Sequence, residues 1–237
     1  MAISAVGALA QTSSDVVETT LAVSPTAAGS ALVLAVRVFS GAETVTSVSG
    51  GGVGAWARVA GPTVDTYPEA NSSREIWLGE VTSSGASTIT VTYSATPAVL
   101  TELMAQEFSS TLGVGATWAR VDAQAGLLDN TSTAAPLFPG LTASAAGQLY
   151  FGHMTFEQAA GNGNTTGFTY VDAPHDNKVI YNANVSAGAV QPSAVQTPAS
   201  TAHAIAVLIT DGIARRPYVR RDLTRRHRAR SIIRRFF

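Results

Sequence analysis

The segment VDAPHDN carries residues that could do chemistry, because carboxylates and imidazoles bind cations and move protons. Asp172, His175 and Asp176 lie within five residues of one another, and such a group could gather around a cation in a loop. Asp, Pro and Asn are also ordinary turn residues, since their side chains and backbone angles stabilise turns. We favour the turn, and we expect neither a metal site nor a cofactor.

The remaining histidines point to structural roles. His153 and Glu157 are four residues apart, which on a strand places them on one face but far apart along it. We expect them to be a surface pair. His203 begins an apolar run and is expected to be structural, and His227 belongs to the basic C-terminal segment.

Compact catalytic signatures are absent from the sequence. It has no GxSxG elbow, no phosphate-binding glycine loop, no HExxH motif and no dinucleotide fingerprint. Acids are numerous, yet no two of them stand out as a glycosidase pair. There is no cysteine, which excludes disulfides and thiolate metal sites. We therefore expect that the protein is not an enzyme.

Four aromatic residues are candidates for glycan binding. Exposed rings at Trp56, Tyr67, Trp77 and Trp118 could stack on sugars. Large aromatic side chains are more often buried in the core, where they contribute much apolar area. A carbohydrate-binding or host-adhesion module is therefore the alternative function.

Charge is segregated along the chain, although the net charge is only −1. Residues 1–213 hold 5 Lys and Arg against 15 Asp and Glu, whereas residues 214–237 hold 10 Arg and one Asp. The result is an acidic body of about −10 followed by a basic arm of about +9. The candidate partner-binding residues of the arm are Arg215, Arg216, Tyr218, Arg220, Arg221, Arg225, Arg226, Arg228, Arg230, Ile232, Ile233, Arg234, Arg235, Phe236 and Phe237.

Several partners suit this arm, which we expect to be extended or partly helical. A solvated tail, nucleic acid and a membrane surface are all compatible with its arginines and its apolar end. Arginine makes planar, bidentate bonds to carboxylates, which favours docking onto a protein, including the acidic body of a neighbouring copy. We expect protein partners and a homo-oligomer, with nucleic acid as a further candidate and no membrane partner.

The elements that must position these residues are strands. Ala31 to Phe39 is a nearly continuous apolar run, typical of a strand buried on both faces. Arg74 to Ser94 alternates in two runs around TSSGAS, which predicts a hairpin. Leu100 to Ser109 has helical propensity, but its position favours a strand. Ile3 to Leu9 resembles the apolar part of a leader but lacks a preceding basic residue, so we expect a retained edge strand.

Composition supports one all-β body. The chain is 46% hydrophobic and 13% charged, too apolar for a disordered protein, and no apolar run approaches the roughly 20 residues that span a bilayer. Many short strands with turn residues every 8 to 12 positions are typical of a sandwich. We predict an antiparallel, jelly-roll-like β-sandwich over residues 1–213 and a separate arm over residues 214–237. VGAWARV from Val53 and VGATWARV from Val114 are a faint internal echo, compatible with duplication or with similar strand positions.

Five segments in order carry a family resemblance: SALVLAVRVFSG, TVTSVSGGGVGAWARV, REIWLGEV, STITVTYS and AQEFS. Together they resemble a jelly-roll module of tailed-bacteriophage virion proteins and of some bacterial surface proteins, over about Ala28 to Ser109. The bias toward Ala, Gly and Arg with one Lys resembles proteins of actinobacterial phages. The arm departs from the isolated module.

This resemblance implies a structural role on the particle, as a capsid decoration protein or a minor tail protein. Its implied partners are the major capsid or tail proteins of the same virion. Its implied location is the particle surface, after synthesis in the host cytoplasm. A nucleic-acid-contacting virion protein is the third hypothesis, favoured if the arm reaches the particle interior.

Overall fold

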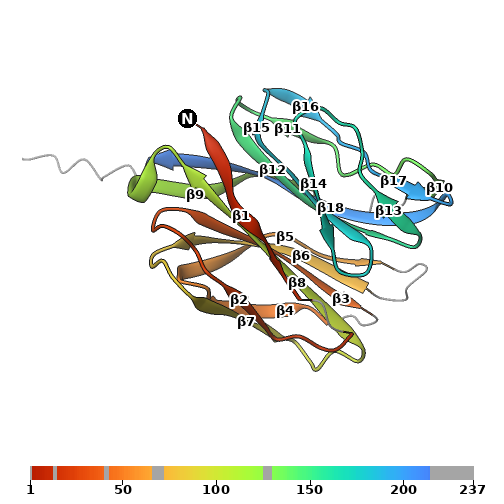
Figure 1. Ribbon diagram of the computed structural model, residues 1–237, viewed down its shortest axis with the longest axis horizontal. Coiled ribbons are helices and arrows are strands. Elements are labelled where there is room, and N and C mark those ends of the chain that lie inside the picture. Colours follow the sequence, from red (N-terminus) through yellow and green to blue (C-terminus); the bar gives the residue numbers. More distant parts are fainter. Residues whose placement is uncertain (1, 13–14, 40–42, 66–71, 125–129, 214–237) are drawn as a thin grey trace, which may run out of the picture.

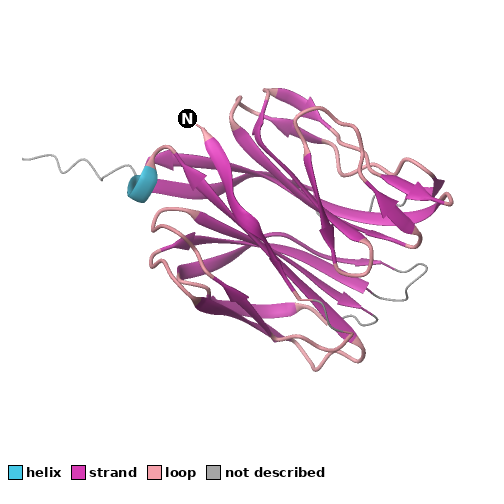
Figure 2. Cartoon of the chain, viewed as in Figure 1, coloured by secondary structure: helices cyan, strands magenta, loops and turns pink. Residues whose placement is uncertain are grey.

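Strands make up nearly all of the regular secondary structure in the described part of the chain (Figure 2). The computed structural model describes residues 2–12, 15–39, 43–65, 72–124 and 130–213. Within these ranges the helical content is a single 3-10 turn, η1 (Gly113–Gly115). The predicted all-β antiparallel fold is confirmed.

Residues before η1 form one sandwich, the first sandwich. Its strands are β1 (Ile3–Gln11), β2 (Thr20–Val23), β3 (Ala31–Phe39), β4 (Val45–Gly50), β5 (Val53–Asp65), β6 (Ser72–Val81), β7 (Ser87–Tyr93) and β8 (Leu100–Ser110). The first large sheet has the order β1-β8-β3-β6-β5, and β2-β7-β4 form a smaller sheet facing it. Consecutive strands alternate between the two sheets as in a jelly roll, as predicted, except that β5 and β6 pair with each other within the large sheet.

Residues after η1 form the second sandwich. Its strands are β9 (Ala116–Gln124), β10 (Asn130–Thr133), β11 (Leu141–Ala143), β12 (Gln148–Phe156), β13 (Ala159–Gly161), β14 (Thr169–Ala173), β15 (Asn177–Val185), β16 (Gly188–Val190), β17 (Val195–Thr197) and β18 (Ser200–Ile213). The second large sheet runs β10-β18-β12-β15-β14, with β9 also paired to β18. Two short pairs, β11 with β16 and β13 with β17, cover its outer face.

The two sandwiches repeat one strand order. In both large sheets, the first strand in the sequence lies beside the last strand. The next three strands are β3, β6 and β5 in the first sandwich, and β12, β15 and β14 occupy the same positions in the second. The short pairs of the second sandwich correspond to β2-β7 and β4-β7. The similar segments VGAWARV and VGATWARV do not mark this repeat. Val53 begins β5 and Val114 leads into β9, and these two strands occupy different positions in their sheets.

The two large sheets pack face to face, so the sandwiches are stacked (Figure 1). Their shared core includes Phe108 of β8, which packs edge-on against Phe151 at 6.2 Å and Tyr181 at 5.3 Å between ring centroids. Such pairs add about 0.5–1.5 kcal/mol each beyond their buried area. Two further cores lie inside the individual sandwiches.

Stacking explains why the central strands are buried on both faces. In β3, Leu32 and Leu34 face the smaller sheet, while Val33 and Ala35 face the second sandwich. The prediction of a doubly buried strand here is confirmed. The same holds for β8, where burial on both faces overrides the local preference for helix.

The predicted hairpin over Arg74 to Ser94 is wrong. Both strands form, but β6 pairs with β3 and β5, whereas β7 pairs with β2 and β4. The TSSGAS connection carries the chain across the sandwich to the facing sheet instead of folding it back within one sheet. Local turn chemistry is similar in both cases, so the sequence around the turn does not distinguish them.

Candidate functional site

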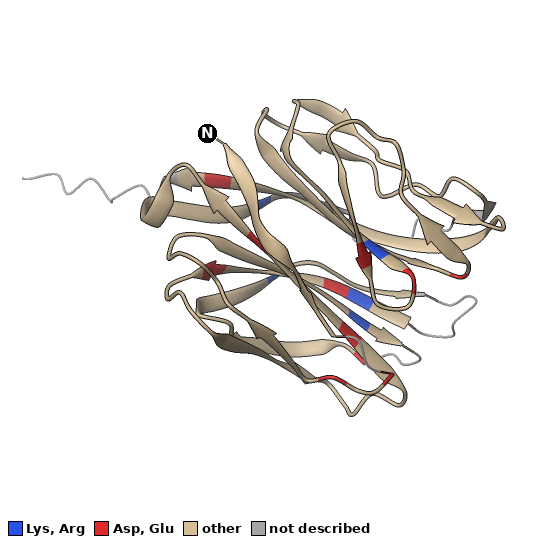
Figure 3. Cartoon of the chain, viewed as in Figure 1, with Lys and Arg blue, Asp and Glu red and all other residues tan. Residues whose placement is uncertain are grey.

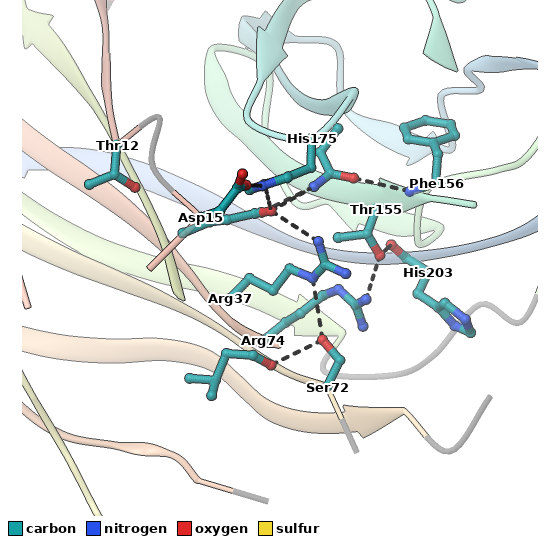
Figure 4. A network of polar contacts seen from close by, with 12 residues as sticks. Thr12, Asp15, Arg37, Ser72, Arg74, Thr155, Phe156, His175 and His203 are labelled. Carbon is teal, nitrogen blue, oxygen red and sulfur yellow. Dashed lines mark hydrogen bonds and ion pairs between the residues drawn. The ribbon is translucent and has the colours of Figure 1, made fainter. Parts of the chain in front are cut away.

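A network of polar side chains lies at one end of the interface between the two sandwiches, beside the apolar core that they share (Figure 4). The alternation of β3 places Arg37 on the same face as Val33 and Ala35, so the arginine points toward the second sandwich. Arg74 of β6 and Glu102 of β8 are the cross-strand neighbours of Arg37 in the same sheet, and they lie on the same face as Arg37. All three side chains are almost fully buried.

Glu102 is the centre of the network. Its Oε1 accepts a hydrogen bond from Arg37 Nη1 at 3.0 Å, and its two oxygens lie 3.1 and 3.0 Å from Asn177 Nδ2. Asn177 belongs to the second sandwich, where its Oδ1 accepts from the backbone N–H of Phe156 at 3.1 Å. The buried carboxylate therefore joins β8 to β15 and β12.

His175 bridges two carboxylates. Its Nδ1 lies 2.7 Å from Glu102 Oε1 and its Nε2 lies 2.6 Å from Asp15 Oδ1. Two ionised carboxylates require both ring nitrogens to donate, which makes the ring an imidazolium. Burial lowers the pKa of His175, but the Asp15 hydrogen bond and the Glu102 charge outweigh it and raise the pKa above its ordinary value.

His175 occupies a turn with unusual backbone geometry. His175 and Asp176 have φ of 56° and 57°, the left-handed region that few non-glycine residues adopt. This turn joins β14 to β15, so the expectation that VDAPHDN is a turn is confirmed. In the described residues, no group of three or more His, Cys, Asp and Glu could hold a metal ion.

Arg74 and the nearby His153 are also buried between the two sandwiches. Arg74 donates to the Thr155 hydroxyl, and Thr155 contacts the His203 carbonyl at 3.5 Å. His153 is fully buried, and neither ring nitrogen has a hydrogen-bond partner among the described residues. Burial, then the charges of Arg74 and Arg37, lower its pKa well below the ordinary value, so His153 is neutral.

The prediction that His153 and Glu157 form a surface pair is wrong. β12 is covered on both faces, so the alternation that brings His153 to one face buries it under the first sandwich. Glu157 lies beyond the end of β12 and accepts from the Ser200 hydroxyl and the Thr201 N–H. His203 is buried in β18 and has a structural position, as expected.

The geometry of the network suits cohesion between the sandwiches. Both ring nitrogens of His175 are occupied by carboxylates, so neither is available to activate a hydroxyl or a water molecule. Acidic and basic residues are close together where the two large sheets meet (Figure 3). Buried charges require partners, and here the partners come from both sandwiches.

Sequence reasoning did not single out Arg37, Arg74, Glu102 and Asn177. One usable signal was present, because Arg37 interrupts the apolar run ALVLAVRVF. A charged residue inside a doubly buried strand needs a partner elsewhere in the fold. The identity of that partner depends on tertiary packing and is not encoded locally.

The candidate glycan-binding tryptophans are engaged with the body. Trp77 is buried, its ring N–H donates to Glu75 Oε2 at 3.0 Å, and Arg58 lies 5.1 Å above its ring. The half-buried Trp56 and Trp118 donate to the carbonyls of Gly50 and Gly29, both at 3.0 Å. Tyr67 lies outside the described residues.

All candidate arm residues also lie outside the described residues. The structure does describe which charged residues lie on the surface of the body. Of its five Lys and Arg, Arg37, Arg74 and Lys178 are buried, which leaves Arg58 and Arg120 exposed. The acids of the described residues that are exposed or half-buried are Asp15, Glu18, Glu43, Glu80, Glu157, Asp172 and Asp176. The accessible charge of the described body is therefore predominantly negative.

Comparisons of the chain with protein-family models, with curated proteins and with solved structures found no match. Among the described residues, no helix is long and apolar enough to cross a membrane.

Proposed function

We propose that the protein is a structural component of a phage virion, either a capsid decoration protein or a minor tail protein. In this proposal the stacked sandwiches form an acidic body on the particle surface. The Arg-rich arm anchors this body to the particle lattice or to neighbouring copies.

The observation that carries the proposal is the separation of charge. Three of the five Lys and Arg residues in residues 1–213 are buried inside the body, so the exposed acidic residues have few basic neighbours. Ten arginines follow within residues 214–237. An acidic surface and a basic arm on one chain are complementary between copies, and many weak contacts give strong attachment through multivalency.

The stacked arrangement supports a mechanical role. A shared apolar core and a buried polar network join the two sandwiches. Such an interface resists relative movement, because buried Glu102 would lose Asn177 and His175 if the sandwiches separated, and Arg74 would lose Thr155. The resemblance of Ala28 to Ser109 to a virion jelly-roll module agrees with this role.

Association with purified heads and tails tests the proposal. The full chain is compared with a chain ending at Ile213, the last residue of β18, over a series of salt concentrations. We expect the full chain to bind one particle part, with binding that weakens as salt screens the charges, and the truncated chain to remain folded but unbound.

Matched arm variants separate charge from hydrogen-bond geometry. Replacing Arg220, Arg221, Arg225 and Arg226 by Gln should abolish binding, whereas replacing them by Lys keeps the charge and should retain part of it. Equal binding by the full and truncated chains contradicts the anchoring role. Binding to DNA without binding to particles would favour the nucleic-acid-contacting alternative.

A further inference from the structure

An open groove of about 600 Å³ lies at the edge of the second sandwich. It runs between the segment that leads into β14, the end of β15 and strand β16. Its volume is within the range of about 300–1,000 Å³ that is typical of small-ligand sites.

The chemistry of the lining is neutral and polar. Of the described residues that form the groove, none has an ionisable side chain. The polar groups are three carboxamides and three hydroxyls, from Asn182, Asn184, Gln191, Thr165, Thr166 and Ser186. Carboxamides and hydroxyls each donate and accept hydrogen bonds.

Internal hydrogen bonds orient part of this lining. Asn182 Oδ1 accepts from the Asn184 N–H at 2.9 Å, and Asn184 Nδ2 donates to the Ile3 carbonyl at 3.2 Å. Thr165 Oγ1 accepts from the Ser193 N–H at 3.1 Å. Within the described residues, neither Asn182 Nδ2 nor the Gln191 side-chain amide has a hydrogen-bond partner, which leaves both for a ligand.

The groove also has a fixed aromatic wall. The half-buried Phe168 packs edge-on against Tyr150 at 5.2 Å between ring centroids. Tyr150 is itself buried, and its hydroxyl donates to the Pro139 carbonyl at 2.8 Å. Gly167 has φ of +82°, and a Cβ there would lie 2.8 Å from Asn182 Nδ2, so glycine permits the close approach of this segment to the amide.

We propose that this groove binds a neutral saccharide. Sugar hydroxyls donate and accept hydrogen bonds, which matches carboxamides, and the apolar face of a sugar ring matches an aromatic wall. An anionic ligand would find no cation in the lining, and a cationic ligand would find no carboxylate. An apolar ligand would leave the carboxamides unpaired, at a cost in affinity.

This inference does not depend on the virion proposal. It also places glycan binding in a different part of the fold from the candidate tryptophans, two of which belong to the first sandwich. The arm is not required, because the lining comes entirely from residues 165–191.

The test uses the full chain at physiological salt and a panel of neutral gluco-, galacto-, manno- and arabino-oligosaccharides, read out by calorimetry. Neutral probes avoid attraction to the arginines of the arm. We expect saturable binding of at least one sugar. Gln191→Ala should weaken it about threefold to tenfold, the loss expected for one hydrogen bond. Phe168→Leu keeps an apolar side chain but removes the aromatic ring, and it should weaken sugar binding more than Gln191→Ala does.

Gln158→Ala is the matched control, because Gln158 is an exposed carboxamide outside the groove. Thermal unfolding of each variant verifies that the fold is retained. Absence of binding by the whole panel overturns the inference. The inference is also overturned if the Gln191→Ala and Phe168→Leu variants bind sugar as strongly as the Gln158→Ala control.

Discussion

Replacing Glu102 by alanine removes the acceptor shared by Arg37, His175 and Asn177. The two nearby guanidinium groups, Arg37 and Arg74, remain buried at 3% and 1% exposure. Removing one partner of a buried ion pair costs about 3–5 kcal/mol, because the other charge is left in a poorly solvated place. We expect Glu102→Ala to lower the free energy of unfolding by that amount.

Urea unfolding followed by circular dichroism and tryptophan fluorescence measures this loss. The control is Glu80→Ala, because Glu80 is half-exposed on β6 and is outside the network, and surface substitutions of this kind change stability by less than about 0.5 kcal/mol. A loss below about 1 kcal/mol for Glu102→Ala would refute the view that this carboxylate joins the sandwiches.

A double-mutant cycle measures the coupling energy between Arg37 and Glu102 apart from their other contacts. Arg37→Met and Glu102→Leu each leave one buried group without its partner, whereas the double variant replaces both charges by apolar side chains. The double variant should lose less stability than the two single losses combined, by about 0.5–3 kcal/mol. Strict additivity would mean that the 3.0 Å contact between them contributes no coupling.

Three further predictions concern single residues. The His175 contribution to the free energy of unfolding should be fully present below about pH 6.5 and should be lost as pH rises through the raised pKa. The reason is that the folded protein holds a proton on His175 over a pH range where the unfolded chain has released it. His175→Ala should therefore cost more stability at pH 5.5 than at pH 8.5, and the reverse order in urea titrations contradicts the imidazolium bridge. His153 has a lowered pKa, so wild type should lose stability as pH falls below about 6.5. His153→Leu should lose less over the same interval, and identical acid profiles would exclude a neutral buried ring. Gly50→Ala should destabilise the protein by more than about 1 kcal/mol in thermal unfolding, because φ is +75° and a Cβ would lie 2.1 Å from the Thr88 carbonyl. Gly115→Ala, where a Cβ meets open space, is its control.

Local pattern was sufficient to predict individual strands but not their partners. The apolar run from Ala31 and the strand from Leu100 were predicted correctly because their composition and position indicate burial. The connection after Val81 was misassigned, since a short polar turn can join strands within a sheet or across a sandwich. The burial of His153 was missed for a related reason, because alternation gives a face but not what covers it.

The polar network required information that no short segment contains. Asp15, Arg37, Glu102 and His175 belong to four separate parts of the chain. They meet because two sandwiches stack through their large sheets, and that stacking was not predicted. The charge separation between body and arm needs no fold and was evident from composition.

Electron microscopy of purified phage particles, labelled with an antibody against the folded body, directly tests the proposed location on the virion surface. We expect label at regular positions on the outer surface of the head or the tail. Particles assembled with the chain ending at Ile213 should lose this label, although the truncated protein is present in the lysate. Absence of label from intact particles that contain all other virion proteins would contradict the virion proposal.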